Sequence, residues 1–460
     1  MVFFWSGRYI LGRKQPEQSI DGAKAMQTFS SKDEHMAWLE TQSALPSGFW
    51  CGVAPLTFVP AEVPKPANMK LTLILAERPT PDFAAVFTQN AFPGAPVIIG
   101  RKRLDEPTLR AIIINNKISN VCAPNGVETS ERLCTAVAQQ FGMDAGQVLP
   151  SSTGIIGWQL PATEMCTALP TVANTLQSKS ILPAAEGMMT TDLYPKVRRV
   201  DIGDGCIVGI AKGAGMIEPN LATMLVYILT DITVPRDELR AILAAAVAPS
   251  FNAISVDSDE STSDTVALMS SGVHACDDIE AFKKGVFEVC AKLAEDVVRN
   301  GEGVKHVVTC EVRNAPDSAM AKAIAKSVIN SPLLQCAICG NDPNVGRLVC
   351  AVGKCVGNDF PGTDLSACHM AIGGKTVFSD GAFHIPPELE TKLSDCLKDA
   401  ELYESAPPDE NGVFRPPVSW PAHEKTVDIL VDLGCGDGAF TAIGGDRTHE
   451  YISENADYRS

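Results

Sequence analysis

The sequence predicts a mixed α/β protein in which β-sheets are layered between helices and a smaller domain follows at the C-terminus. Short apolar runs typical of buried strands occur at 71–75, 111–115 and 224–230. They alternate with helical amphipathic patterns at 129–141 and 279–297. With 460 residues, the chain is long enough for two or three domains with an ample core.

The charge balance of the chain narrows the range of partners. A formal net charge of -17 argues against nucleic acids and anionic membrane surfaces, because both require a basic face. No apolar run approaches the roughly 20 residues needed to span a bilayer. The 15 cysteines are odd in number and scattered singly, a pattern that suits thiols in a reducing compartment better than a disulfide framework.

Residues 1–47 are expected to form an N-terminal extension, because they show little periodicity. Their first 14 residues are apolar, with three basic residues and no acid, as in an organelle-targeting segment. Their density of Ser and Arg is low for a transit peptide. Both the mitochondrial matrix and the cytoplasm therefore stay open as locations.

The region 48–222 continues with strands and one clear helix. Leu133, Val137 and Phe141 recur at four-residue spacing, and Gly142 ends the pattern, so 129–141 is predicted to be a capped helix. The small residues of 151–157 leave backbone N–H groups free to face an anion, as in an oxyanion hole. On these residues alone, an ordinary turn is the favoured interpretation.

The segment 211–225 is the most unusual stretch of the chain. Lys212 brings a charge, Gly213 and Gly215 allow close backbone approach, and Pro219 interrupts regular structure. Thr223 then precedes the buried strand at 224–230. A threonine at this junction is either a structural strand-edge residue or a nucleophile on a rigid support.

The region 223–460 contains further helices, strands and loops. Helices are predicted at 236–247 and 318–328, and a strand at 306–312. The acidic loop 255–264 lacks the spacing of a calcium site, so a solvated or substrate-facing loop is expected. Glu302 follows the end of the long helix, on a glycine-flanked turn, where it is either exposed or available to hold an amine.

Two apparent cofactor signals are rejected. Residues 427–439 resemble a strand followed by a glycine-rich nucleotide loop, but the rest of such a sheet has no room downstream, so a strand and a tight turn are predicted. Four cysteines resemble two zinc-ligand pairs, but one pair is loosely spaced and the other lies in an apolar run; they are Cys336, Cys339, Cys350 and Cys355. We expect no metal.

An ordered set of motifs resembles the ornithine acetyltransferase family, the bifunctional glutamate N-acetyltransferases of arginine biosynthesis. The motifs follow the family's order from about residue 48 to the C-terminus. They are Ser152-Thr-Gly-Ile-Ile-Gly157, Met189-Thr-Thr-Asp192, Lys212-Gly-Ala-Gly-Met-Ile217, Pro219-Asn220, Ala222-Thr-Met-Leu225, Gly301-Glu-Gly303, Ser331-Pro-Leu333, Asp342-Pro-Asn344, Gly346-Arg347 and Asn455-Ala-Asp-Tyr-Arg459.

The resemblance implies a self-processed architecture with an N-terminal threonine. The precursor would cut itself between Ala222 and Thr223, and Thr223 would carry the acetyl group from N-acetylornithine to glutamate in a ping-pong cycle. Thr153 and Gly154 match the family's oxyanion-hole pair. The matching substrate-binding positions are Thr190, Lys212, Thr223, Glu302, Asn455 and Ser460.

The resemblance also implies partners and cofactors. The α and β chains would stay associated, as a heterotetramer of two of each. No cofactor is expected, although acetyl-coenzyme A is open as an alternative acetyl donor. By charge, Lys212 suits the substrate α-carboxylate and Glu302 its side-chain amine.

The chain departs from the family's pattern at several positions. Residues 116–120 replace a glycine-containing loop, Val345 stands where Trp is usual, and Ser258 stands where Gly is usual. Residues 445–447 differ near the end, and Glu218 places a carboxylate close to the predicted cut. Two other functions therefore stay open: an N-terminal-threonine amidohydrolase or aminopeptidase, and an unprocessed relative without catalysis.

Overall fold

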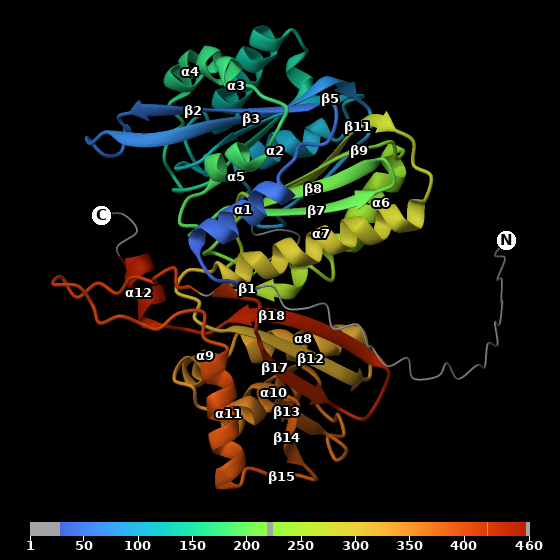
Figure 1. Cartoon of the computed structure of the whole chain (residues 1–460), viewed down its shortest axis with the longest axis vertical. Coiled ribbons are helices and arrows are strands. Elements are labelled where there is room, and N and C mark those ends of the chain that lie inside the picture. Colours follow the sequence, from blue (N-terminus) through green and yellow to red (C-terminus); the bar gives the residue numbers. More distant parts are fainter. Residues whose placement is uncertain (1–27, 219–223, 421, 457–460) are drawn as a thin grey trace.

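The computed structural model describes residues 28–218, 224–420 and 422–456, which form two lobes stacked along the long axis of the molecule (Figure 1). The first lobe contains two sheets and the second contains one larger sheet. The predicted mixed α/β class, with sheets layered between helices, is confirmed.

The first lobe is built around two sheets packed face to face. A five-stranded sheet has the order β4-β11-β9-β8-β7, and a four-stranded sheet has the order β2-β3-β5-β6. Apolar residues from both sheets form one buried cluster between them, including Ile74, Ile112 and Tyr227. The strands are β2 (Phe49–Phe58), β3 (Ala67–Thr80), β4 (Phe83–Phe87), β5 (Leu109–Asn115), β6 (Val148–Ser152), β7 (Lys196–Ile202), β8 (Gly205–Lys212), β9 (Leu225–Ile232) and β11 (Thr265–His274).

Helices cover both outer faces of this pair of sheets. Helices α3 (Gly126–Phe141) and α4 (Ala162–Asn174) pack on the four-stranded sheet, and α6 (Arg236–Val247) and α7 (Ile279–Arg299) pack on the five-stranded sheet. Figure 1 shows the resulting order of helices, sheet, sheet and helices. The shorter helices of this lobe are α2 (Ala95–Arg103) and α5 (Leu182–Met188).

The second lobe has a seven-stranded sheet with its own apolar core. Its strand order is β10-β18-β12-β17-β13-β14-β15. The strands are β10 (Ile254–Ser255), β12 (Val307–Ala315), β13 (His369–Ile372), β14 (Lys375–Ser379), β15 (Ala382–Phe383), β17 (Val427–Asp432) and β18 (Gly438–Gly445). The helices are α8 (Ser318–Ile329), α9 (Pro332–Cys339), α10 (Val345–Asp359), α11 (Pro387–Asp399) and α12 (His449–Ala456).

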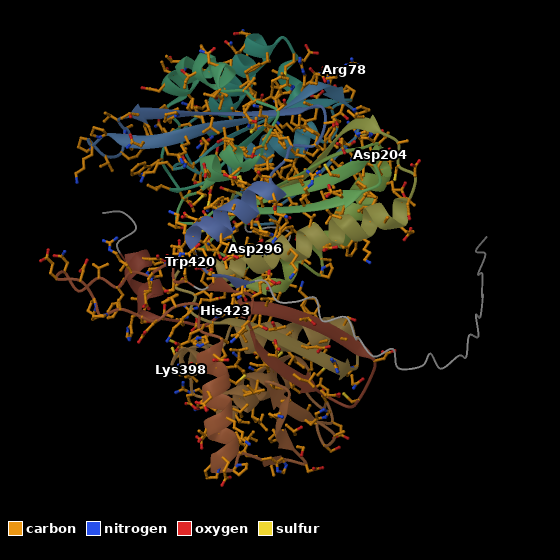
Figure 2. All side chains as sticks on the ribbon, in the orientation of Figure 1. Arg78, Asp204, Asp296, Lys398, Trp420 and His423 are labelled. Carbon is orange, nitrogen blue, oxygen red and sulfur yellow. The ribbon has the colours of Figure 1, made fainter. Side chains whose placement is uncertain are left out.

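The N-terminal part of the described chain joins the two lobes. Strand β1 (Thr28–Phe29) pairs with β16 (Ala422–His423) of the second lobe, whereas helix α1 (Lys32–Gln42) packs against β7 of the first. Asp296 and His423 lie at this junction (Figure 2). There the guanidinium of Arg299 donates to the backbone carbonyl of His423 at 3.1 Å. Residues 28–47 therefore contain a packed helix and a strand, which the sequence patterns did not indicate.

Most predicted elements of secondary structure are present. Helices 236–247 and 279–297 correspond to α6 and α7, and the glycine-rich run after 427 forms β17, a tight turn and β18. The predicted helix 129–141 begins three residues earlier, at Gly126, and ends as expected at Gly142, whose φ is 64°. All 15 cysteines are free thiols, and in the described ranges no helix is long and apolar enough to cross a membrane.

Candidate active site

A pocket of about 280 Å³ opens where the two sheets of the first lobe meet helix α12. It is lined by residues at the end of β6, the end of β8, the start of β9 and the segment before β11. Six of the residues predicted from the sequence lie on its wall, although they come from distant parts of the chain: Thr153, Gly154, Thr190, Lys212, Glu302 and Asn455.

Thr153 and Gly154 follow directly after strand β6. The Thr153 N–H donates to the carbonyl oxygen of Asn115 at 3.0 Å. Both residues line the pocket, so the Thr153 hydroxyl and the Gly154 N–H are the donors of this loop that could serve an oxyanion there. Gly154 has a φ of 123°, and an added Cβ would lie 2.7 Å from the amide nitrogen of Ile118, so only glycine fits there.

A buried carboxylate holds two of the predicted substrate loops in place. Asp192 accepts hydrogen bonds from the Thr190 N–H at 3.1 Å and from the Gly213 N–H at 2.9 Å. Its side chain and that of Lys196 are fully buried, and they form an ion pair of 2.5 Å. Burial by itself raises the pKa of Asp192, but the ammonium groups of Lys196 and Lys212 outweigh it and lower that pKa to about 2.

A second carboxylate, that of Asp257, holds the loop that leads from β8 toward the predicted cut. The carboxylate of Asp257 accepts hydrogen bonds from the backbone N–H groups of Met216 and Ile217, at 2.6 and 2.7 Å. The Glu218 N–H donates to the carbonyl oxygen of Asp259 at 2.9 Å. Residues 216–218 are therefore fixed on the segment 255–259, directly before the first residues that lie outside the described ranges.

Glu302 forms the acidic end of the pocket. Its exposed fraction is 9%, and its carboxylate lies so close to Gly215 that a Cβ there would overlap it. The side-chain amide of Asn455, on α12, donates to Glu302 Oε2 at 2.9 Å. The C-terminal helix thus reaches the pocket, as the predicted role of Asn455 requires. A carboxylate in this position suits a substrate amine.

Three of the predicted site residues, Ala222, Thr223 and Ser460, lie outside the described residues. The chain resumes at Met224 and Leu225, both of which line the pocket. Leu225 is the first residue of β9, which is buried along its whole length between β8 and β11. The predicted nucleophile therefore directly precedes a residue on the pocket wall.

Two departures from the family's pattern have structural consequences. Ser258 has a φ of 63°, which explains why glycine suits this position. The Glu218 carboxylate accepts a hydrogen bond from the Asn330 side-chain amide at 2.6 Å and lies 3.6 Å from the ammonium of Lys326. This extra carboxylate near the predicted cut is thus paired with groups of the second lobe.

No role in the site was predicted from the sequence for three of its polar residues. Asp192 and Asp257 hold the loops, and Asp264 lies on the pocket wall. Asp257 and Asp264 belong to the acidic segment that was expected to be solvated or substrate-facing, and its end at 261–264 does face the pocket. Among the described residues, no group of His, Cys, Asp or Glu side chains could hold a metal ion.

Comparison with known proteins identifies relatives over most of the chain. The model of the ArgJ family matches residues 57–460. The arginine biosynthesis bifunctional protein ArgJ 2 of Clostridium acetobutylicum is 36% identical over 376 residues, which cover 82% of this chain and 89% of the relative. The glutamate N-acetyltransferase Oat2 of Streptomyces clavuligerus is 33% identical over 386 residues, which cover 84% and 92%.

A solved structure is also similar to part of the chain. The ornithine acetyltransferase from Mycobacterium tuberculosis, complexed with ornithine, has 30% sequence identity, covers 39% of this chain and 97% of its own, and gives a TM-score of 0.35. Because the family model and the relatives span most of the sequence, this chain belongs to the ArgJ family.

Proposed function

We propose that the chain cuts itself between Ala222 and Thr223 and then uses Thr223 to carry an acetyl group from N-acetylornithine to glutamate. Membership in the ArgJ family makes it an acetyltransferase of arginine biosynthesis that acts on small molecules. The observation that carries the mechanism is the pocket beside Met224, which gathers Thr153, Gly154, a lysine and a glutamate.

The chemistry of a terminal threonine fits this site. A free α-amino group has an ordinary pKa of about 7.7–8.0, so near neutral pH it can accept the proton of the neighbouring hydroxyl. The Thr223 oxygen then attacks the acetyl carbonyl, whose developing negative charge would face the Thr153 hydroxyl and the Gly154 N–H. Each such donor is typically worth about 3 kcal/mol in the barrier.

The charged side chains on the pocket wall suit the donor substrate. Lys212 would bind the α-carboxylate of N-acetylornithine, and Glu302 with Asn455 would bind its side-chain amine. After ornithine leaves, glutamate enters, and its amine attacks the acetyl ester. Lys212 would hold its α-carboxylate in the same way.

The two chains produced by the cut would stay together. Strand β8 ends before the predicted cut and β9 begins after it, yet they are antiparallel neighbours with Lys212 paired to Leu225. Their separation would break the five-stranded sheet and expose its core. Assembly into two copies of each chain is an additional prediction, which light scattering of the purified protein tests.

Intact-mass analysis of the purified protein tests the cleavage. We expect two fragments that separate at Ala222–Thr223 in the wild type and one uncut chain in Thr223→Ala. Product analysis with and without glutamate tests the transfer, because an amidohydrolase would release acetate whether or not glutamate is present. An uncut wild type without acetyl transfer would refute the proposal. Acetyl-coenzyme A, supplied in place of N-acetylornithine, tests the alternative donor.

A further inference from the structure

Asp264 occupies a fixed place on the pocket wall, directly before β11. Its carbonyl oxygen accepts a hydrogen bond from the Thr88 N–H at 3.1 Å, and the next N–H, that of Thr265, donates to the Met224 carbonyl at 3.0 Å. Thr265 is paired with Leu225 in the parallel register of β11 and β9. Asp264 therefore lies at the level of Met224, the residue that follows the predicted nucleophile.

The side chain of Asp264 is buried without a full set of partners. The residue is 2% exposed, and its Oδ2 atom has no hydrogen-bond partner within the described residues. A buried polar atom of this kind costs about 1–3 kcal/mol unless something satisfies it. A ligand in the pocket that Asp264 lines could supply the missing hydrogen bond.

The charged and polar groups around Asp264 allow its carboxyl to hold a proton. Burial raises its pKa well above the ordinary value, and the carboxylate of Glu260 acts in the same direction. The Ser261 hydroxyl and the ammonium of Lys212 act in the opposite direction but do not outweigh burial. Among the described residues, Glu302 is the other acidic side chain on the wall of this pocket. The surroundings of Asp264 therefore favour the neutral form of its carboxyl.

The proposed reaction needs a proton carrier in addition to the groups that already have a role in it. When acetyl leaves N-acetylornithine, the α-nitrogen must gain two protons to become an ammonium. The Thr223 hydroxyl supplies one. Of the ionisable side chains on the described pocket wall, Lys212 and Glu302 are assigned to the substrate's own charges, which leaves Asp264.

We propose that Asp264 donates the second proton to the leaving nitrogen of N-acetylornithine and takes it back from the ammonium of the incoming glutamate. This inference rests on the proposed acetyl transfer through Thr223. In the first half-reaction, the bond from nitrogen to the acetyl carbon breaks, the bond from that carbon to the threonine oxygen forms, and Asp264 becomes a carboxylate beside the ornithine ammonium.

The second half-reaction restores the starting state. The glutamate ammonium gives one proton to Asp264, and the resulting amine attacks the acetyl ester. As the new bond to nitrogen forms, the bond to the threonine oxygen breaks, and the second nitrogen proton returns to that oxygen. The products are N-acetylglutamate, a free threonine hydroxyl and a neutral Asp264. A carboxyl with a raised pKa suits both directions of this exchange, because it holds a proton more readily than an ordinary aspartate and can still give it to a more basic amine nitrogen.

Asp264→Asn tests the inference, because it keeps the shape of the side chain and removes its ionisable carboxyl group. Two acetyl donors are compared after intact mass has confirmed the cut state. N-acetylornithine has a leaving nitrogen that needs the proton, whereas p-nitrophenyl acetate has a phenolate that needs none. We expect kcat for transfer from N-acetylornithine to glutamate to fall by about 100-fold or more. Acetylation of Thr223 by p-nitrophenyl acetate should stay close to that of the wild type.

Two further variants sharpen the comparison. Asp277→Asn makes the same change at an exposed residue beyond the other end of β11 that does not line the pocket, and it should leave both activities unchanged. Asp264→Glu keeps an ionisable group, and it should retain part of the transfer with a displaced pH profile. In the wild type, kcat/KM for N-acetylornithine should fall at alkaline pH as Asp264 loses its proton. This fall should be absent from Asp264→Asn.

Several results would overturn the inference. An equal loss with both donors would indicate a structural role, and unchanged transfer in Asp264→Asn would show that the proton comes from elsewhere. If Asp264→Asn and Asp264→Glu both stayed uncut, the carboxyl would belong to self-cleavage and not to transfer. Failure of the proposed function would look different, because the wild-type Thr223 itself would not be acetylated by either donor.

Discussion

The substitution Gly215→Ala probes the acidic end of the pocket without removing a charged group. The backbone of Gly215 is outside the left-handed region, so alanine adds little strain to the chain itself. The new Cβ, however, would lie 2.7 Å from Glu302 Oε1 and closer still to Oε2. Ordinary van der Waals contact begins near 3.4 Å, so the carboxylate must move by about 1 Å or more.

The size of the expected change in KM follows from the contacts of Glu302 that this movement would break. Glu302 would lose its hydrogen bond with the Asn455 amide and its position at the end of the pocket. A hydrogen bond to a charged group is worth about 1.5–3 kcal/mol net, which corresponds to about 10- to 100-fold in binding. We therefore expect the KM for N-acetylornithine to rise by about this factor. kcat should change less, because the residues assigned to the acetyl group stay in place.

Steady-state kinetics of the cut enzyme with N-acetylornithine as the varied substrate measures this effect. Gly353→Ala, on α10, is the matched control, because an added Cβ there meets nothing within 4 Å. Its KM should equal that of the wild type. A wild-type KM in the cut Gly215→Ala enzyme would refute the assignment of Glu302 to the substrate amine. A fall in kcat with an unchanged KM would place Glu302 in the chemical step instead.

Three further predictions concern the stability of the site. The pKa of Asp192 is about 2 in the folded protein, against an ordinary value of 3.8. This difference adds about 2 kcal/mol to the free energy of unfolding above pH 4. That stabilisation is lost as the pH falls toward 2. Asp192→Asn should remove that pH dependence from urea unfolding. Burial, followed by the charges of Glu302 and Glu450, raises the pKa of Glu454 to about 7, so its ionisation destabilises the fold increasingly from about pH 4.5 to 7. Glu454→Gln should have a higher Tm than the wild type at pH 8 and an equal Tm at pH 4. Ser258→Gly should relieve the strain of a φ of 63°, about 1 kcal/mol, and a lower urea midpoint would contradict this.

The secondary structure was predictable where one periodic face of a segment is buried. Helix α7 shows this clearly, because its apolar residues recur at helical spacing and its end is marked by Asn300. Helix α1 was missed because only His35 and Leu39 are buried along its length, which leaves no apolar stripe to recognise. Its start is marked instead by Ser31, which caps the helix by accepting the Glu34 N–H at 3.2 Å.

The sequence by itself determined the alternation of strands and helices, the glycine-ended α3 and the ordered motifs that place the chain in its family. These signals are local, because each depends on residues close together in the chain. Only the tertiary structure shows which of these motifs contact one another. The pairing of β9 with β8 and β11 brings Met224 between Lys212 and Asp264, and α12 brings Asn455 to Glu302. No spacing along the chain encodes those contacts, since they arise from strand register and from the close approach that Gly215 permits.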